Sequence, residues 1–247
     1  MPPAAVQIRV EAAHGYAVVQ AGARMTLPDL PGLRAAIEKA LRDLGTALVD
    51  LTATRRPEPI MTAVFPAALG NCGGWPWAKL AIFGADAELA DLLARTRVNQ
   101  LVPVWPTEAQ ALAGIGHRPP WVRVAATLPY TPSAPAGGRA TVERACLAWH
   151  VPAHVRDAAV LIASELVSNV VQHAGTGSVL SVDRGRRTLT VAVRDFAPDR
   201  PVRVLAADAG PPFGGLAVVA ALGRHWGVRP YPDGKAVSVR LPIAPAR

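Results

Sequence analysis

The sequence predicts two domains, an α/β domain followed by a two-layer α+β domain. Short strand-like runs alternate with helical runs in the first half, which is typical of a mostly parallel sheet with covering helices. In the second half two helical runs precede adjacent strand-like runs, which is typical of helices packed on an antiparallel sheet. The segment "GIGHRPP" at 114–120 interrupts the alternation. We therefore expect domains at 1–118 and 119–247.

The first domain opens with strand-like runs at 7–10 and 17–20, which predict a hairpin. The segment "DLPGLRAAIEKALRDLG" then has apolar residues at helical spacing, and we expect this helix to start after a capping Asp29 and stop at Gly45. The remaining elements alternate: strand 47–51, helix 59–69, strand 80–84, helix 86–95, strand 101–105 and a helix at 107–112 introduced by a capping Thr107. This order predicts a mostly parallel sheet with a mixed edge.

The second domain opens with a strand at 121–128 and a turn through "PYTPSAPAGG". Two helices at about 139–150 and 152–173 precede paired strands at 178–183 and 188–195. A loop rich in Pro, Asp and Gly is expected at 196–213, then a helix at 214–226 and a hairpin turned at "PDGK".

Composition excludes several classes of protein. The formal net charge is +8, but arginine is spread thinly, without the basic stripe and aromatic platforms that direct nucleic-acid binding favours. No apolar run reaches the roughly 18 residues of a membrane span. The start, "MPPAAVQIRVEAA", lacks the features of a signal peptide, so we expect a soluble, cytoplasmic protein without a membrane partner. Cys72 and Cys146 show neither a zinc nor a disulfide pattern.

The stretch "ASELVSNVVQHAG" at 163–175 ends a long helix and carries Glu165, Asn169 and His173 at intervals of four residues. This spacing places them on one helical face. On a helical projection Asn169 and His173 lie at the edge of the apolar arc, Glu165 lies just outside it, and Ser164 and Val167 lie opposite the core. An unpaired carboxylate or amide beside the core is costly. The three side chains therefore need partners: they either cap neighbouring loops and the helix end, or bind a ligand.

Two later features favour the ligand. The strand "TLTVAVRD" ends on Asp195, whose carboxylate can accept a hydrogen bond from an amino group. The last predicted helix begins at Gly214, Gly215 and Leu216, where glycines let backbone N–H groups approach an anion.

This ordered set resembles the ATP-binding domain of the GHKL superfamily, a Bergerat-type two-layer sandwich, and most of all the anti-sigma-factor serine/threonine kinases. The resemblance spans about residues 120–247 and includes the closing "HWGVRPYPDGKAVSVRLP". It implies ATP and Mg²⁺ as cofactors, with Asn169 as the magnesium ligand and Glu165 as the catalytic base. It further implies Asp195 at the adenine, Gly214, Gly215 and Leu216 at the phosphates beneath a 196–213 lid, and a supporting role for His173. Family members often dimerise through this domain, which makes a homodimer an expectation.

The sequence departs from the family pattern in two places. "DFAPD" lacks the glycines that usually follow the adenine-site aspartate, and "FGGL" lacks the basic residue that often begins the lid helix. With these departures, two alternatives remain: a domain that binds a nucleotide and transfers its phosphoryl group, and one that binds a nucleotide without transfer.

The first half resembles a STAS domain, the fold of the anti-sigma-factor antagonists that such kinases phosphorylate. Glu58 and Pro59 stand where the antagonists have Asp and the phosphorylated Ser, and proline has no hydroxyl. Thr54 and Thr62 are the nearest hydroxyls, and a structural role is favoured for both. We expect this domain to dock partners or to restrain its neighbour rather than to be its substrate.

The sequence therefore predicts an ATP-dependent regulator that phosphorylates Ser or Thr of a separate STAS-type antagonist and controls a sigma factor by partner switching. The alternative is a nucleotide-binding scaffold without turnover, which acts only through protein–protein interaction.

Overall fold

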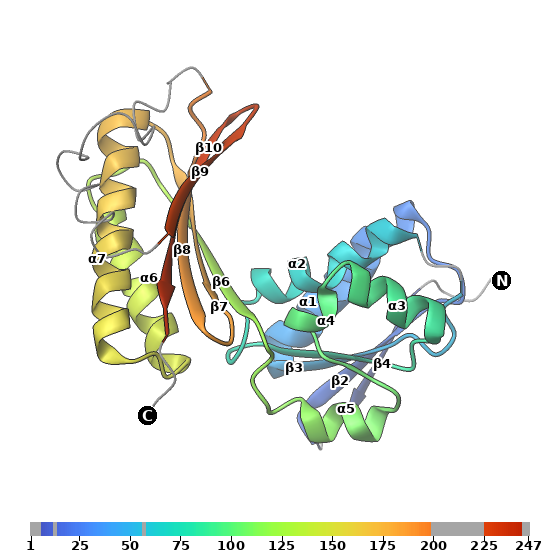
Figure 1. The fold of residues 1–247 in the computed structure, drawn as a ribbon. Coiled ribbons are helices and arrows are strands. Elements are labelled where there is room, and N and C mark those ends of the chain that lie inside the picture. Colours follow the sequence, from blue (N-terminus) through green and yellow to red (C-terminus); the bar gives the residue numbers. More distant parts are fainter. Residues whose placement is uncertain (1–5, 12–13, 56–57, 199–224, 244–247) are drawn as a thin grey trace. The chain divides into compact units, whose positions relative to one another are not determined.

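The computed structural model describes residues 6–11, 14–55, 58–198 and 225–243. The chain divides into two compact units, Met1–Arg123 and Val124–Arg247 (Figure 1). The boundary expected from the sequence, between residues 118 and 119, lies on the amino-terminal side of this division.

The first unit contains a five-stranded sheet with the order β1-β2-β3-β4-β5. β1 (Val6–Glu11) and β2 (Tyr16–Ala21) form the predicted antiparallel hairpin. β3 (Thr46–Asp50), β4 (Lys79–Phe83) and β5 (Val104–Trp105) follow in parallel with β2. The predicted mostly parallel sheet with a mixed edge is confirmed.

Helices cover both faces of this sheet (Figure 1). On one face lie α1 (Leu30–Leu44), α2 (Val64–Asn71), α3 (Ala87–Arg95) and the short α4 (Val98–Leu101). Their apolar side chains join the sheet in the main core, which includes Leu33, Val49, Phe65, Ile82 and Leu93. On the opposite face α5 (Glu108–Gly114) contributes Ala111 to a smaller core.

The turn before α1 differs from the prediction. Asp29 does not cap α1; its carboxylate accepts hydrogen bonds from the backbone N–H (2.8 Å) and hydroxyl (2.6 Å) of Thr26, across the short 3-10 turn Leu27–Asp29. Asp29 has a helical backbone conformation rather than the extended one of a capping residue, its carboxylate is already bound by Thr26, and Pro31 removes one of the two N–H groups that it could accept from. The predicted stop is confirmed, because Gly45 is left-handed and its N–H donates to the Leu41 carbonyl.

Two further elements of the first unit fall close to their predicted places. The helix expected at 59–69 begins as a 3-10 turn, Pro59–Ala63, and continues as α2. The strand expected at 101–105 is reduced to β5, because residues before it are helical and Pro103 and Pro106 directly flank its two residues.

The second sheet has the order β6-β7-β8-β10-β9. Its strands are β6 (Val122–Leu128), β7 (Ser178–Arg184), β8 (Thr188–Asp195), β9 (His225–Tyr231) and β10 (Gly234–Pro242). The pairs β7–β8, β8–β10 and β10–β9 are antiparallel. The predicted pairing of the strands at 178–183 and 188–195 and the hairpin predicted at "PDGK" are therefore confirmed.

One face of this sheet is covered by α6 (Ala134–Ala148) and α7 (Ala153–Asn169) (Figure 1). Alternate residues of β8, namely Leu189, Val191 and Val193, are buried beneath these helices. The predicted two-layer α+β architecture is confirmed.

Two secondary-structure boundaries in the second unit differ from the prediction. α6 begins at Ala134, inside the segment predicted as a turn, because Pro135 is compatible with the first helical turn. His225 and Trp226, predicted to end a helix, belong to β9 instead. The rest of that predicted helix lies outside the described residues. Wherever the structure is described, every helix is too short or too polar to cross a bilayer.

Candidate functional site

Helix α7 carries the candidate residues, and its burial differs from the simple two-faced pattern. The predicted apolar arc is confirmed, since Val155, Ala159, Ile162, Leu166 and Val170 are all buried. Val167, predicted to lie opposite the core, is fully buried as well. The prediction for Val167 was wrong because α6 packs along that side of α7 and supplies a second apolar neighbour.

Gly138, Arg139 and Ser164 allow α6 and α7 to pack closely against each other. A Cβ atom on Gly138 of α6 would lie 3.2 Å from a methyl group of Val167, so glycine allows the two helices to approach closely. The Arg139 guanidinium donates a hydrogen bond of 2.9 Å to the Ser164 hydroxyl. Ser164 therefore also faces α6. On another side of α7 lie Leu161, which is 41% exposed, and the half-buried Glu165 and Asn169, at four-residue intervals.

Glu165 and Asn169 are half-buried and lie one turn apart at the end of α7. Within the described part of the chain, neither side chain has a hydrogen-bond or ion-pair partner. Neither side chain has a polar atom that is both fully buried and without a hydrogen-bond partner. Both groups therefore remain accessible to solvent or to a ligand, and no described loop uses them as caps.

The chain beyond Asn169 leaves the α-helical geometry. Residues Val170–Ala174 form a single π-helical turn, closed by a hydrogen bond of 3.1 Å from the Gly175 N–H to the Val170 carbonyl. Gly175 is left-handed, with φ of 67°. His173 is exposed and lies in this wider turn, so the four-residue stacking expected from the sequence holds for Glu165 and Asn169 only. Single π turns within helices occur frequently at functional sites.

Asp195 ends β8 and is 3% exposed. Its carboxylate forms an ion pair of 2.7 Å with the Lys235 ammonium and accepts hydrogen bonds from the backbone N–H groups of Lys235 (3.1 Å) and Ala197 (3.3 Å). The buried charge is thus satisfied by groups of the chain itself. An amino group that bound to Asp195 would share the carboxylate with Lys235.

Sequence reasoning missed the Lys235 contact. The two residues are 40 positions apart, and they meet because β10 pairs with β8 in antiparallel register beside the turn at 232–233. The "PDGK" turn signal could have placed Lys235 at the start of the last strand, but no pattern fixed which residue of β8 lies beside it.

On the opposite face of β8, Arg194 lies at the centre of a second cluster. Its guanidinium donates two hydrogen bonds to Asp233, at 2.7 and 2.8 Å, and stacks over the rings of Phe196 and Tyr231 at 5.0 and 4.3 Å. These contacts fix the turn between β9 and β10.

The predicted anion-binding residues Gly214, Gly215 and Leu216 lie outside the described residues, as does most of the expected lid. Across the described ranges, His, Cys, Asp and Glu side chains do not form any group of three that could hold a metal ion. A magnesium site in this part of the chain would therefore depend on ligands such as the Asn169 carboxamide together with oxygens of the bound nucleotide.

In the first unit the two threonines nearest to the expected phosphorylation position are structural. Thr54 is fully buried, and its hydroxyl donates to the Gly22 carbonyl at 3.1 Å. Thr62 is 3% exposed and donates to the Pro59 carbonyl at 2.9 Å. Neither hydroxyl is accessible to a kinase in the folded unit.

Comparison with known proteins gives partial structural likenesses. No protein-family model and no curated protein matches the chain. The RsbU and RsbW domains of Rv1364c from Mycobacterium tuberculosis align at 20% identity and a TM-score of 0.39, covering 51% of this chain and 34% of that one. An anti-sigma factor antagonist from Mycobacterium paratuberculosis aligns at 19% identity and a TM-score of 0.40, covering 47% of this chain and 97% of that one. The protein TM1081 aligns at 10% identity and a TM-score of 0.38, covering 48% of this chain and 90% of that one. At these values the likenesses do not assign the chain to a family.

Proposed function

We propose that the chain is an ATP-binding regulator of the anti-sigma-factor type, with a STAS-like first unit and a GHKL-type second unit. In this proposal it phosphorylates Ser or Thr of a separate STAS-type antagonist and controls a sigma factor by partner switching. The observation that carries it is the pair Glu165 and Asn169. These two side chains lie one turn apart at the end of α7, and no described residue pairs with them.

The chemistry of the two groups suits phosphoryl transfer. The Asn169 carboxamide oxygen is a hard ligand of the kind that Mg²⁺ prefers, and it would hold the ion against the nucleotide phosphates. The Glu165 carboxylate would orient the incoming hydroxyl and accept its proton. Asp195 would accept from the adenine amino group, with Lys235 beside it. Bound ATP·Mg²⁺ would supply the phosphoryl group and neutralise its charge.

The first unit would dock partner proteins or restrain the second unit. Its buried Thr54 and Thr62 and its Pro59 support a module that is not the substrate of its neighbour. The substrate would then be a hydroxyl on another protein, and this predicts that transfer requires a second, serine-bearing STAS protein.

Calorimetry of ATP·Mg²⁺ binding to the full chain tests the proposal. We expect Asn169→Ala to weaken binding by at least about tenfold, because a metal ligand is lost. Glu165→Gln should leave binding close to wild type and abolish transfer of labelled phosphate to an antagonist. Glu143→Gln, an exposed glutamate on α6, is the matched control. No ATP binding, or equal binding by Asn169→Ala, would refute the proposal.

A second candidate, a nucleotide-binding scaffold without turnover, is favoured by the Asp195–Lys235 ion pair. The ammonium competes for the carboxylate that would accept from adenine, and "DFAPD" lacks the glycines expected after Asp195. A nucleotide could still bind, but it would be held less firmly in the position that phosphoryl transfer requires. ATP binding without any transfer to a serine-bearing antagonist would select this candidate. The variant Lys235→Met tests whether Lys235 competes with the nucleotide for Asp195. Tighter ATP binding by this variant would indicate such competition.

A further inference from the structure

The face of the second sheet opposite α6 and α7 is lined by small and polar side chains. Residues alternate between the two faces of a strand, and directly paired residues share a face. Buried Val191 and Val239 therefore point toward the helices, whereas Thr190 and Arg240 point to the other side. We call this second side, formed by β8, β10 and β9, the open face.

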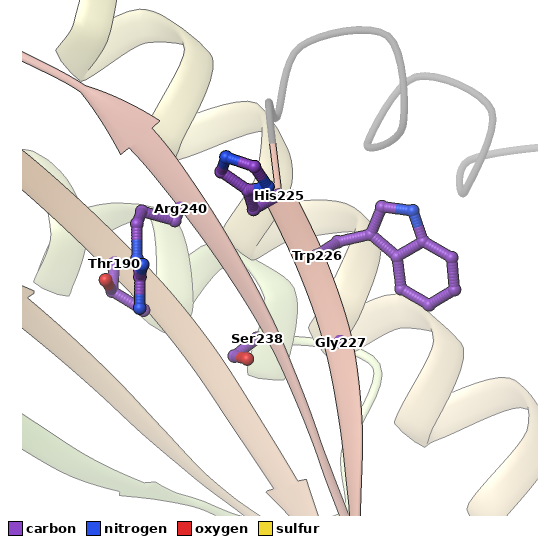
Figure 2. Close-up of a pocket in the computed structure, with 6 residues that line it drawn as sticks. All are labelled: Thr190, His225, Trp226, Gly227, Ser238 and Arg240. Carbon is purple, nitrogen blue, oxygen red and sulfur yellow. The ribbon is translucent and has the colours of Figure 1, made fainter.

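A shallow cavity of about 330 Å³ lies on the open face. It is lined by Thr190, His225, Trp226, Gly227, Ser238 and Arg240. Figure 2 shows these residues on three adjacent strands, with the Trp226 indole directed away from the other labelled side chains. The volume lies near the lower end of the range for small-molecule sites.

Gly227 creates the space for this cavity. It pairs directly with Ser238, so a side chain at this position would project from the open face beside the serine hydroxyl. A Cβ atom built on Gly227 would have no neighbouring described atom within 4 Å. The missing side chain thus leaves a hollow between the row of Thr190, Arg240 and His225 and the hairpin turn.

Register places Arg240 between Thr190 on β8 and His225 on β9. Among the described residues, the Arg240 guanidinium has no carboxylate partner. The acidic group next along this row is Asp183, which lies beyond Thr190 on β7, is buried and has a partner of its own. As far as the structure is described, the cavity therefore presents a positive charge without a paired carboxylate, together with two hydroxyl groups and an imidazole.

We propose that this cavity binds the phosphate group of a small phosphorylated molecule. A guanidinium presents several donors in a fixed fork and binds phosphate through charge-assisted hydrogen bonds. Thr190 and Ser238 add hydroxyl donors from neighbouring strands. A tetrahedral anion with several oxygens can accept from all three strands at once, whereas a carboxylate has only two oxygens.

This site is separate from the proposed ATP site. Asp195 is five residues from Thr190 on the same strand, and odd spacing places the two side chains on opposite faces of the sheet. On the open face, the rings of Phe196 and Tyr231 already stack on Arg194. Trp226 lines the cavity, but it pairs directly with Val239, so its indole projects toward the helix-facing side of the sheet. A small ligand therefore fits the cavity better than a nucleic-acid strand, which requires free stacking platforms.

Titration of the full chain with inorganic phosphate at constant ionic strength tests the proposal, with phosphorus NMR or calorimetry as the readout. We expect saturable binding at one site. Arg240→Gln should weaken it by about tenfold or more, because a charged hydrogen-bond donor is lost. Gly227→Val should weaken it similarly by filling the hollow while leaving every charge in place. Circular dichroism of both variants should match wild type.

Arg24→Gln, which removes an exposed arginine from the first unit, is the matched control and should leave phosphate binding unchanged. Arg240→Gln should also retain ATP·Mg²⁺ binding, which separates this proposal from the proposed function. Equal phosphate affinity in Arg240→Gln, or an equal loss in Arg24→Gln, would overturn the site. A single-stranded oligonucleotide that binds more tightly than phosphate and depends on Arg240 would overturn the small ligand in favour of nucleic acid.

Discussion

Gly234 holds the turn between β9 and β10 against the end of β8, and replacing it should destabilise the second unit. Its φ is 152°, a conformation that side-chain-bearing residues rarely adopt. A Cβ atom here would lie 2.3 Å from the backbone oxygen of Asp195 and 2.9 Å from the Cα of Phe196. Both contacts are with backbone, so relief requires β8 and β10 to separate.

The expected loss for Gly234→Ala follows from these two effects. A residue in a sparsely populated conformation costs about 1–3 kcal/mol, and forcing packed atoms apart costs a similar amount, which predicts a loss of about 2–6 kcal/mol. Gly227→Ala is the matched control on the same hairpin, because its Cβ meets no described atom within 4 Å. We expect that variant to remain close to wild type in stability.

Hydrogen exchange read by mass spectrometry is the suitable assay, because the chain has two units and a single unfolding transition cannot be assumed. Peptides from β8 and β10 should exchange at least about 30-fold faster in Gly234→Ala if exchange follows unfolding of the unit. Peptides from the first unit should not change. Wild-type exchange in β8 and β10, or equal acceleration in Gly227→Ala, would refute the reasoning.

Three further predictions concern groups outside the candidate site. Burial raises the pKa of the fully buried Cys146 thiol to about 12. A thiol reagent at pH 8 should therefore modify the half-buried Cys72 first and Cys146 only after denaturation. Equal rates of modification in the native chain would contradict this. The hydrogen bond from Arg34 holds the pKa of Glu38 below 4.5, so its stabilising effect is present above that pH and is lost as the pH falls through the lowered pKa. Glu38→Gln should therefore lower the stability of the first unit by about 0.5–1 kcal/mol at pH 7 and by less near pH 3 in urea titrations, whereas an equal loss at both pH values would argue against the ion pair. Incubation with labelled ATP should leave Thr54 unmodified by mass spectrometry, and label on that residue would show that its burial does not protect it.

The order of the elements could be predicted from sequence because local signals mark them. Gly45, Thr107 and the "PDGK" turn each act within a few residues, and the structure has a boundary at each of them. Asp29 shows the limit of such signals: it has the right residue type for a cap, but its backbone is helical and its carboxylate binds Thr26 instead.

Contacts between elements could not be derived in the same way. The projection of α7 identified the side facing the sheet, but Val167 is buried by α6, whose position beside α7 depends on Gly138. The π turn after Asn169 leaves the apolar pattern almost unchanged, so periodicity does not distinguish it from a continuing α-helix. The Lys235 ion pair of Asp195 depends on strand register across 40 residues.

One outermost strand of each sheet, β5 in the first and β9 in the second, has a consequence for how other chains can attach. β5 is two residues long and stands between Pro103 and Pro106, while Pro230 interrupts the row of backbone N–H groups in β9. Exposed strand edges are the usual places where a foreign peptide extends a sheet or where copies of a protein aggregate. Proline at both of these edges disfavours such strand addition. We therefore expect a protein that binds at β5 or β9 to be recognised through side chains rather than through backbone pairing.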